Sequence, residues 1–597
     1  MALFLETRTR SDSNSTSQTE TVPPKISTSW LSEPKGQVGY RGRRIGLLVL
    51  ATSLLLALFT ARLVDIQILN REYYLGGINR HTAVSSISGV RGAILDRNGS
   101  VLAVTDTLPT VGADPRLVKL PWATASLIGP IIGTSPESLI DKLRSDRHYI
   151  HLARQVTPDM AEEIRKLKLA GIEIRDEVAR LYPNGDGFAR NILGGVDVDQ
   201  NPLSGLELKF APLLSGEPGV RENFVSASGS VRLPGGELSF EPAQPGKSLV
   251  TTLHAGTQFL TERELQKAVL ATGSQSGTAI VLDVSTGQVL ALVDIDGYSS
   301  IGEARVAGSS GAYQNSFEPG SVTKPFTIAA ALEEGRIAAD QIIDVPYRYK
   351  YSDKDFHEPY VFEDRQLSIR DILAKSSNIG TIRIAEKLGK DHLYSYLRAF
   401  GFGEFTSGQA DVPAWPNEQR GKLHPPTQWE GTGLANIAFG QGVAVTAMQL
   451  AAAFNTIANN GKYVAPALIR GTAGSDGAIH PISPGIQRQV ISATTAATMR
   501  DMLAGVVTQG TGTRAQVDGY SVAGKTGTAQ KAWKDRRGYS DDYTATFAGF
   551  VPAQNPRLTI VVVLDEPDEH LAGLTAAPVF SQIATGALRA LGVPRTK

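Results

Sequence analysis

The chain contains no cysteine among its 597 residues. This absence excludes disulfides, thiolate metal sites and cysteine nucleophiles together, and it leaves the cellular compartment open. The nine histidines show no HExxH or comparable ligand spacing, so the sequence predicts no metal site.

Neither sign of charge is in excess, because Lys plus Arg and Asp plus Glu each number 59. No global charge therefore favours a nucleic-acid partner. Aromatic residues are sparse, at 7%, and no stretch interleaves them with basic residues. The composition therefore argues against a groove for single-stranded nucleic acid as well.

The remaining composition is that of a globular protein, with 42% apolar and 20% charged residues. The length exceeds that of one typical domain and predicts two or three. Changes in composition divide the chain into four segments, which are a polar tail (1–44), an apolar anchor (45–66), a mixed region (67–245) and a region that carries the motifs (246–597).

The first two segments predict a protein anchored in a membrane. The tail has few large apolar residues, which is typical of disorder, and it ends in Arg41-Gly-Arg-Arg44. The stretch that follows is uncharged as far as Ala61 and is long enough to span a bilayer as a helix. Because the basic cluster lies on its N-terminal side, we expect the tail in the cytoplasm and the rest of the chain outside.

Two other interpretations of the apolar stretch are open. A cleaved signal peptide is disfavoured, because no clear small-x-small cleavage site follows and the preceding tail is long. A buried core helix is disfavoured because the stretch has no polar face. An uncleaved single-pass anchor is the prediction.

The mixed region shows structure but no chemistry. Residues 89–103 predict two strands joined by an Asn98-Gly99 turn, and 158–167 has a helical pattern. Proline and glycine cluster between Gly216 and Gly246, which indicates a hairpin and a linker.

The last region predicts strands at both of its ends with helices between them. The first strand pair is 278–283 and 288–293, and the second is 543–551 and 558–564. Between them, Thr446-Ala-Met-Gln449 is a capping box that opens a helix to about Asn459, and Ser368 opens a short helix that ends before Ser376. The pattern indicates an α+β fold, a sheet with a helical insertion.

Two short motifs, at residues 321–324 and 376–378, lie in the region between the two strand pairs. Ser321 and Lys324 are three residues apart after a Pro-Gly turn, so on a helix the amine shares a face with the hydroxyl. A serine needs a base to become a nucleophile, and a lysine whose pKa is lowered by burial and cationic neighbours can serve. Ser376-Ser377-Asn378, in a break between two helices, offers a hydroxyl and an amide to one cavity. Alone, the first motif is common on exposed helices, and the second is equally typical of a turn or helix cap.

The third motif is Lys525-Thr526-Gly527-Thr528, after a short apolar run. On an edge strand, Gly527 allows a ligand backbone to approach, while Lys525 and the two threonine hydroxyls can hold a carboxylate. An ordinary exposed strand end is the alternative for this motif alone.

The same segment literally matches the phosphate-loop pattern GxxxxGK[ST], from Gly519 to Thr526. An ATPase is nevertheless disfavoured. A phosphate loop needs an apolar strand before its first glycine, whereas 508–518 is polar and glycine-rich, and it needs a helix where Gly527 stands. The predicted extracytoplasmic location also argues against a nucleotide.

In this order and spacing, the three motifs resemble the SxxK, SxN and KTG set of penicillin-binding proteins. The surrounding sequence is similar to that of class B members over roughly residues 60 to 595. The similar segments are Phe317-Glu-Pro-Gly-Ser321, Gly440-Gln-Gly442, Gly524-Lys-Thr-Gly-Thr-Ala-Gln530, Arg91-Gly-Ala-Ile-Leu-Asp-Arg-Asn-Gly99 and Gly205-Leu-Glu207. The Ser-Ser-Asn form of the second motif favours the septal, cell-division branch over the elongation branch.

The resemblance implies a fold with an antiparallel five-stranded transpeptidase sheet, flanking helices and a helical insertion (246–597). An elongated, non-catalytic pedestal (67–245) and one transmembrane helix would precede it. It implies a D,D-transpeptidase that forms peptidoglycan cross-links, is inhibited by β-lactams and carries no cofactor and no glycosyltransferase domain. The implied partners are stem peptides ending in D-Ala-D-Ala, an amine acceptor, the cytoplasmic membrane and division-complex proteins including a glycosyltransferase.

The family's roles would fall on eight residues. Ser321 would attack the D-alanyl carbonyl, Lys324 would take its proton, and Ser376 would protonate the departing D-alanine. Asn378 would hold the substrate amide and Lys324. The terminal carboxylate would bind at the third motif, which contributes Lys525, Thr526, Gly527 and Thr528. The backbone N–H groups of Ser321 and Thr528 would form the oxyanion hole.

Other functions stay open beside this one. An elongation-type transpeptidase, a carboxypeptidase and a β-lactam-binding sensor share the fold, and the pedestal and single anchor disfavour the last two. A scaffold for division partners with little turnover is a further alternative, against which the intact motif set argues.

Overall fold

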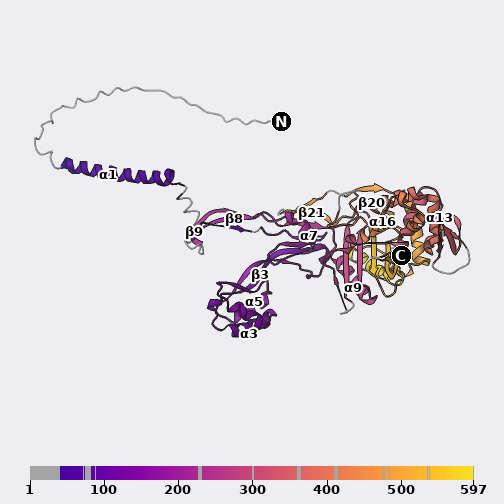
Figure 1. The fold of residues 1–597 in the computed structure, drawn as a ribbon, viewed down its shortest axis with the longest axis horizontal. Helices are drawn as coiled ribbons and strands as arrows, with labels where there is room; N and C mark the ends of the chain where they lie inside the picture. Colours follow the sequence, from indigo (N-terminus) through magenta and orange to yellow (C-terminus); the bar gives the residue numbers. More distant parts are fainter. Residues whose placement is uncertain are drawn as a thin grey trace, which may run out of the picture. The chain divides into compact units, whose positions relative to one another are not determined.

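The structure, a computed structural model, describes residues 41–71, 73, 82–87, 89–225, 232–298, 302–358, 365–408, 414–474, 477–482, 485–533, 536 and 538–595. The tail predicted as disordered lies almost entirely outside the described residues. The chain falls into two compact units, which are Met1–Val84 with Glu222–Leu238, and Ser85–Arg221 with Ser239–Lys597 (Figure 1).

The N-terminal helix α1 (Arg41–Val64) continues through a π-helical turn, Asp65–Leu69. Its segment from Arg44 to Leu69 is long and apolar enough to cross a membrane, and none of its most apolar window is buried in the protein. The core-helix alternative is therefore wrong. At 1.5 Å per residue, these 26 residues extend about 39 Å, more than the hydrocarbon thickness of a bilayer.

The hairpin expected between 216 and 246 is confirmed. Strands β8 (Gly219–Val225) and β9 (Arg232–Glu241) are neighbours in a three-stranded sheet of order β1-β8-β9, with β1 at Thr82–Ile87.

The Asn98-Gly99 hairpin is confirmed as well, between β2 (Ile94–Leu95) and β3 (Val101–Ala113). The long β3 also pairs with β4 (Ile150–Ala153) and with β5 (Ile172–Leu181). Three helices bury a small apolar core with these strands, namely α3 (Pro121–Ile132), α4 (Pro136–Leu143) and α5 (Pro158–Lys166). Short elements complete this region: α6 (Arg190–Leu193), β6 (Gly195–Val196), β7 (Pro202–Ser204), α7 (Gly205–Lys209) and α8 (Ala211–Leu214).

A buried ion cluster joins three segments of this region. Glu207, which is fully buried, accepts from Arg91 Nε at 2.6 Å and from Arg180 Nε at 2.7 Å. Arg91 also donates to the Glu207 carbonyl at 2.6 Å and to Ser215 Oγ at 2.8 Å. Glu207 is therefore the counter-charge for two guanidinium groups that have little contact with water.

Strand β10 (Ser248–Thr251) links this region to the C-terminal region. It pairs in parallel with β2 and antiparallel with β21 (Ile469–Ala473), which in turn pairs with β22 (Ile479–Pro481). Residues near 94 and near 470 therefore belong to one sheet.

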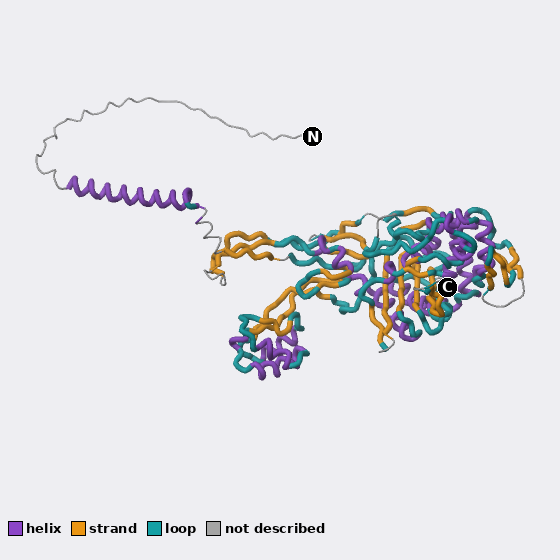
Figure 2. Tube along the Cα trace, viewed as in Figure 1, coloured by secondary structure: helices purple, strands orange, loops and turns teal. Residues whose placement is uncertain are grey.

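The main sheet is antiparallel and has the order β13-β12-β11-β26-β25-β24. Figure 2 draws the strands of the chain in orange and its helices in purple. Its strands are β11 (Ser276–Asp283), β12 (Val289–Tyr298), β13 (Glu303–Val306), β24 (Ala523–Ala532), β25 (Tyr539–Val551) and β26 (Leu558–Asp565). The predicted α+β class and both strand pairs are confirmed. The sheet has six strands where five were expected, because the four-residue β13 extends the edge beside β12.

Side chains of the main sheet alternate between two apolar cores. Ala279 and Val281 face the core that contains α9 (Ala255–Ala271) and α18 (Ala576–Ala590). Ile280 and Leu282 face the larger core with the helical insertion. The insertion comprises α11 (Lys324–Glu333), α12 (Ile369–Ala374), α13 (Asn378–Leu388), α14 (Lys390–Ala399), α15 (Gly433–Ala438), α16 (Ala447–Ala458) and α17 (Ala493–Gln509). Its short strands are β14 (Ser316–Phe317), β15 (Ile342–Val345), β16 (Arg348–Tyr351), β17 (Lys354–His357), β18 (Arg365–Ser368), β19 (Val445–Thr446), β20 (Lys462–Val464) and β23 (Gln487–Gln489).

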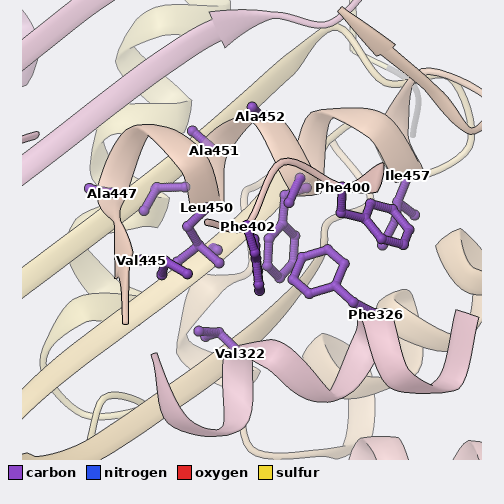
Figure 3. Close-up of a cluster of buried hydrophobic side chains, with 14 of the residues drawn as sticks. Val322, Phe326, Phe400, Phe402, Val445, Ala447, Leu450, Ala451, Ala452 and Ile457 are labelled. Atoms are coloured by element: carbon purple, nitrogen blue, oxygen red, sulfur yellow. The ribbon is translucent and has the colours of Figure 1, made fainter. Parts of the chain in front are cut away.

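An aromatic cluster lies at the centre of the insertion. The Phe326 ring on α11 lies 4.9 Å from that of Phe400 and 5.3 Å from those of Phe402 and Phe454. Val322, in the turn directly before α11, and Phe326, on α11, point toward Phe400 and Phe402 (Figure 3). The predicted capping box of Thr446 and Gln449 is present at the start of α16, which packs over this cluster. The first turn of α11 is therefore held by close-packed side chains on the face that carries Phe326.

We expect Glu207→Gln to destabilise the protein strongly. Two buried guanidinium groups would lose their counter-charge, which typically costs about 3 kcal/mol or more. The urea midpoint of the detergent-solubilised chain measures this. Glu173→Gln, which breaks an exposed pair with Arg175, is the control and should leave the midpoint unchanged. Equal midpoints for the two variants would contradict the assignment of Glu207 as an essential counter-ion.

Candidate active site

Ser321 lies in a 3₁₀ turn, Gly320–Thr323, directly before α11. Pro325 has no N–H to donate to the Ser321 carbonyl in an α-helical bond. The Lys324 N–H donates to that carbonyl instead, so the tighter turn satisfies it. Ser321 is half-buried.

Two glycines hold this turn in place by close backbone contact. The Gly320 N–H donates to the Gly440 carbonyl at 3.0 Å, and a Cβ on Gly440 would lie 2.1 Å from the Gly320 oxygen. On the other side, a Cβ on Gly527 of β24 would lie 2.8 Å from the Pro319 oxygen and from Val322 Cγ1. The turn therefore lies against the edge strand of the main sheet, and a larger residue at either glycine would displace it.

The amine of Lys324 is fully buried and points at the second motif. It donates to the Ser376 carbonyl at 2.5 Å, to Asn378 Oδ1 at 2.7 Å and to Ser376 Oγ at 3.2 Å. Burial lowers the pKa of Lys324 to about 7, and the nearby Glu358 carboxylate partly opposes this shift. Near neutral pH the amine can therefore be neutral, with a lone pair available for a proton.

Ser376 occupies the break between α12 and α13 with a backbone φ of 59°, in the left-handed region. Its hydroxyl lies between the two lysines, because Lys525 Nζ donates to the same Oγ at 2.9 Å. The three motifs thus meet at this one oxygen, although 149 residues separate Ser376 from Lys525 and Lys324 lies farther still from Lys525 in the sequence.

Lys525 lies on β24 and is fully buried. Its amine also donates to the Thr526 carbonyl at 3.0 Å and to Thr526 Oγ1 at 3.3 Å. Burial, and then the neighbouring Lys324, hold the pKa of Lys525 well below the usual lysine value. It is energetically unfavourable for the buried amines of Lys324 and Lys525 to be charged at the same time. An anion that binds beside Lys525 would therefore favour protonation of its amine.

The two threonines of the third motif differ in their surroundings. Thr526 is buried, and its hydroxyl lies 2.6 Å from that of Thr511. Thr528 is half-buried, and its hydroxyl makes only long bonds of 3.3 Å, to the His570 carbonyl and from the Ala572 N–H. Because a hydroxyl has one donor and two acceptor positions, Thr528 Oγ1 keeps one acceptor position beyond these two long bonds.

Glu358 is a residue of this site that the sequence did not reveal. Only 5% of it is exposed, and it follows β17 directly. Its carboxylate accepts from Ser377 Oγ at 2.5 Å, from the Ile379 N–H at 3.0 Å and from the Asn378 N–H at 3.1 Å. No motif or periodicity marks this position, because its burial depends on where the pairing of β16 with β17 places it.

The phosphate-loop interpretation is wrong. Lys525 and Thr526 lie within the ten-residue strand β24, so no helix begins there to present its N-terminus to a phosphate. The described residues also contain no group of three or more His, Cys, Asp or Glu side chains suited to a metal.

Comparison with known proteins agrees with this arrangement. Residues 277–585 match the penicillin binding protein transpeptidase domain, and residues 86–251 match the penicillin-binding protein dimerisation domain. The chain is 33% identical to penicillin-binding protein PbpB of Mycolicibacterium smegmatis, over 85% of this chain and 83% of that one. It is 31% identical to peptidoglycan D,D-transpeptidase FtsI of Escherichia coli, over 92% of each chain.

Solved structures give the same result. The crystal structure of penicillin binding protein 3 from Mycobacterium tuberculosis, complexed with aztreonam, superposes with a TM-score of 0.66 at 28% identity. It covers 86% of this chain and 98% of that one. The chain therefore belongs to the class B penicillin-binding proteins, of the cell-division type.

Proposed function

We propose that the chain is a serine D,D-transpeptidase that cross-links peptidoglycan during septal wall synthesis, through an acyl-enzyme on Ser321. The observation that carries this proposal is the convergence of Lys324 and Lys525 on Ser376 Oγ beside the Ser321 turn. It supplies a base, a proton relay and a cationic anchor in one place.

In the first half-reaction, Ser321 Oγ attacks the carbonyl between the two terminal D-alanines. Lys324, neutral near its pKa of about 7, accepts the hydroxyl proton. Its two short hydrogen bonds to Ser376 O and Asn378 Oδ1 use two donors and leave the lone pair for this proton. The backbone N–H groups of Ser321 and Thr528 stabilise the oxyanion.

Collapse of the tetrahedral intermediate breaks the C–N bond to the last D-alanine. The proton on Lys324 passes through Ser376 Oγ, 3.2 Å away, to the departing amine. An amine of a second stem peptide then attacks the ester, restores the Ser321 hydroxyl and forms the cross-link.

The terminal carboxylate of the donor peptide binds at Lys525, Thr526 and Thr528. Its negative charge raises the pKa of the Lys525 amine from its lowered value, so binding takes up a proton there. Gly527 allows the peptide backbone to approach β24, and Asn378 holds the substrate amide. A β-lactam, which mimics D-Ala-D-Ala, acylates the same serine, in keeping with the aztreonam complex of the similar M. tuberculosis protein.

The proposed organisation assigns residues 1–44 to a cytoplasmic tail and 45–66 to a single-pass anchor. Residues 67–245 form the pedestal, and 246–597 form the extracytoplasmic transpeptidase domain. Exposed apolar side chains along α1, with basic residues at its start, support this topology. The proposed partners are division-complex membrane proteins, including a glycosyltransferase that supplies the glycan strands.

We expect a fluorescent penicillin to label the chain at a single site, Ser321. Peptide mapping after labelling identifies the acylated residue. Ser321→Ala should abolish labelling while the unfolding midpoint stays the same, and Ser309→Ala, at an exposed serine, should label normally. Labelling of folded Ser321→Ala protein would refute the assignment of the nucleophile.

The acylation rate should rise with pH through about 7. Below this value Lys324 is protonated and cannot accept the serine proton, and above it the amine is neutral. Stopped-flow acylation by a fluorescent penicillin between pH 5.5 and 8.5 measures the profile.

Replacement of this base by arginine tests its role. Lys324→Arg keeps a cation that cannot lose its proton, so we expect a loss of about 100-fold or more in the acylation rate. Lys387→Arg, at an exposed lysine near the end of α13, is the control. A rate that is flat with pH in the wild-type protein would argue against Lys324 as the base.

A further inference from the structure

Beside the acylation site, the ionisable side chain of Glu358 has no part in the mechanism above. Glu358 lies outside all three motifs, 18 residues before Ser376 and next to β17. Its backbone N–H donates to the Tyr347 carbonyl at 3.2 Å, which continues the pairing of β16 with β17. The hairpin thus carries its carboxylate to the start of α13.

Within the described residues, the hydrogen bonds of this carboxylate come from the second motif and from Ile379, the residue that follows it. The two oxygens receive one hydroxyl and two backbone N–H groups, from Ser377, Asn378 and Ile379. Each of these three groups donates its hydrogen to the Glu358 carboxylate. The arrangement therefore suits an ionised carboxylate, which can only accept hydrogen bonds. Its charge also lies at the N-terminus of α13, where the helix dipole favours an anion.

A second contact extends the effect into the helix. Ser377 Oγ, which donates to Glu358, accepts from the Gly380 N–H at 2.9 Å as the N-cap of α13. A Cβ on Gly380 would lie 2.8 Å from that oxygen, so only glycine leaves room for the cap. Glu358, Ser377 and Gly380 therefore form one chain of contacts that sets where α13 begins.

The start of α13 in turn fixes the acceptors of Lys324. Asn378, whose Oδ1 accepts from Lys324 Nζ at 2.7 Å, is the first residue of the helix. Ser376, whose carbonyl and hydroxyl face the same amine, directly precedes the cap. A shift of the Ser377–Ile379 backbone would displace both groups.

Resting on the proposed function, we infer that Glu358 is a positioning residue for acylation. It holds the Ser376–Asn378 loop against the general base Lys324 and supplies the negative charge beside that amine. Glu358 does not touch the reacting atoms, and it acts through Asn378 and Ser376.

The negative charge of Glu358 affects the pH dependence of acylation, a quantity that a purely structural role of this residue would not change. The charged groups that act on Lys324 in the described part of the chain are Glu358 and, from β24, Lys525. The other groups around the amine, from Ser376 and Asn378, are neutral. Because Glu358 raises the pKa of Lys324, its removal lowers that pKa, and the acid limb of the acylation profile moves to lower pH.

The decisive experiment compares the full-length wild-type chain with Glu358→Gln and Glu358→Asp in detergent. Penicillin acylation rates are measured from pH 5.5 to 8.5, together with the unfolding midpoint. We expect Glu358→Gln to lower the plateau rate about tenfold or more, since small displacements in a catalytic constellation are costly. Its acid limb should lie at lower pH than that of the wild-type protein.

Glu358→Asp keeps the charge but shortens the side chain. We expect a smaller loss of rate and an acid limb at the wild-type position. Glu386→Gln, which removes an exposed carboxylate near the other end of α13, is the matched control and should leave both quantities unchanged.

Folded Glu358→Gln protein with the wild-type rate and pH profile overturns the inference. If that variant shows no cooperative unfolding transition, Glu358→Asp decides, and a wild-type rate for it overturns the inference too. A wild-type chain that penicillin does not acylate would instead refute the proposed function, so the two failures are distinguishable.

Discussion

The site depends on two buried lysine amines that share one hydroxyl oxygen. Lys324 and Lys525 have no exposed surface, and each lies within 3.2 Å of Ser376 Oγ. Burial of an ammonium is unfavourable, and burial of two side by side is more so. The lowered pKa of each amine is the direct result, and it suits the roles proposed for them, Lys324 as a base near neutral pH and Lys525 as a receptor for an anion.

Such an arrangement holds only if the surrounding fold cannot relax. The turn before α11, α11 itself and the start of α13 are each fixed by a different contact. Phe326 anchors α11 in the aromatic cluster, Gly440 and Gly527 fix the turn before it, and Glu358 fixes the start of α13. The unfavourable electrostatics of the amines is therefore offset by packing and hydrogen bonds, several of which come from residues outside the three motifs, namely Phe326, Gly440 and Glu358.

Much of this could be predicted from the sequence because the signals are local. The strand pairs around 278–293 and 543–564 alternate or run apolar between turn residues, and the Thr446 capping box is a four-residue pattern. The resemblance of the three motifs to a known family led to the expectation that Ser321, Lys324, Ser376 and Lys525 serve one site, and the structure brings Lys324, Ser376 and Lys525 together. The exclusion of the phosphate loop also rested on local context, the glycine directly after Lys525-Thr526.

The features that could not be predicted depend on tertiary contacts. Strand β13 has only four residues, too few for a recognisable period, and it forms because β12 offers a free edge. Arg91, Arg180 and Glu207 come from segments up to 116 residues apart, and their pairing follows only from the packing of β5 and α7. Glu358 resembles any surface glutamate in the sequence, and only the β16–β17 hairpin places it inside the protein.

At Ser376 the backbone conformation favours glycine, whereas the hydrogen bonds of the site require a hydroxyl. The φ of 59° at Ser376 would suit glycine, and a non-glycine residue there typically costs about 1 kcal/mol. Glycine would remove the hydroxyl on which both lysines converge, so the chain carries the strained residue. The strain persists because the Ser376 carbonyl is held by Lys324 on one side and the next three residues are held by Glu358 on the other. Residues outside the motif thus make its chemistry possible, and this is why motif residues alone do not define the site.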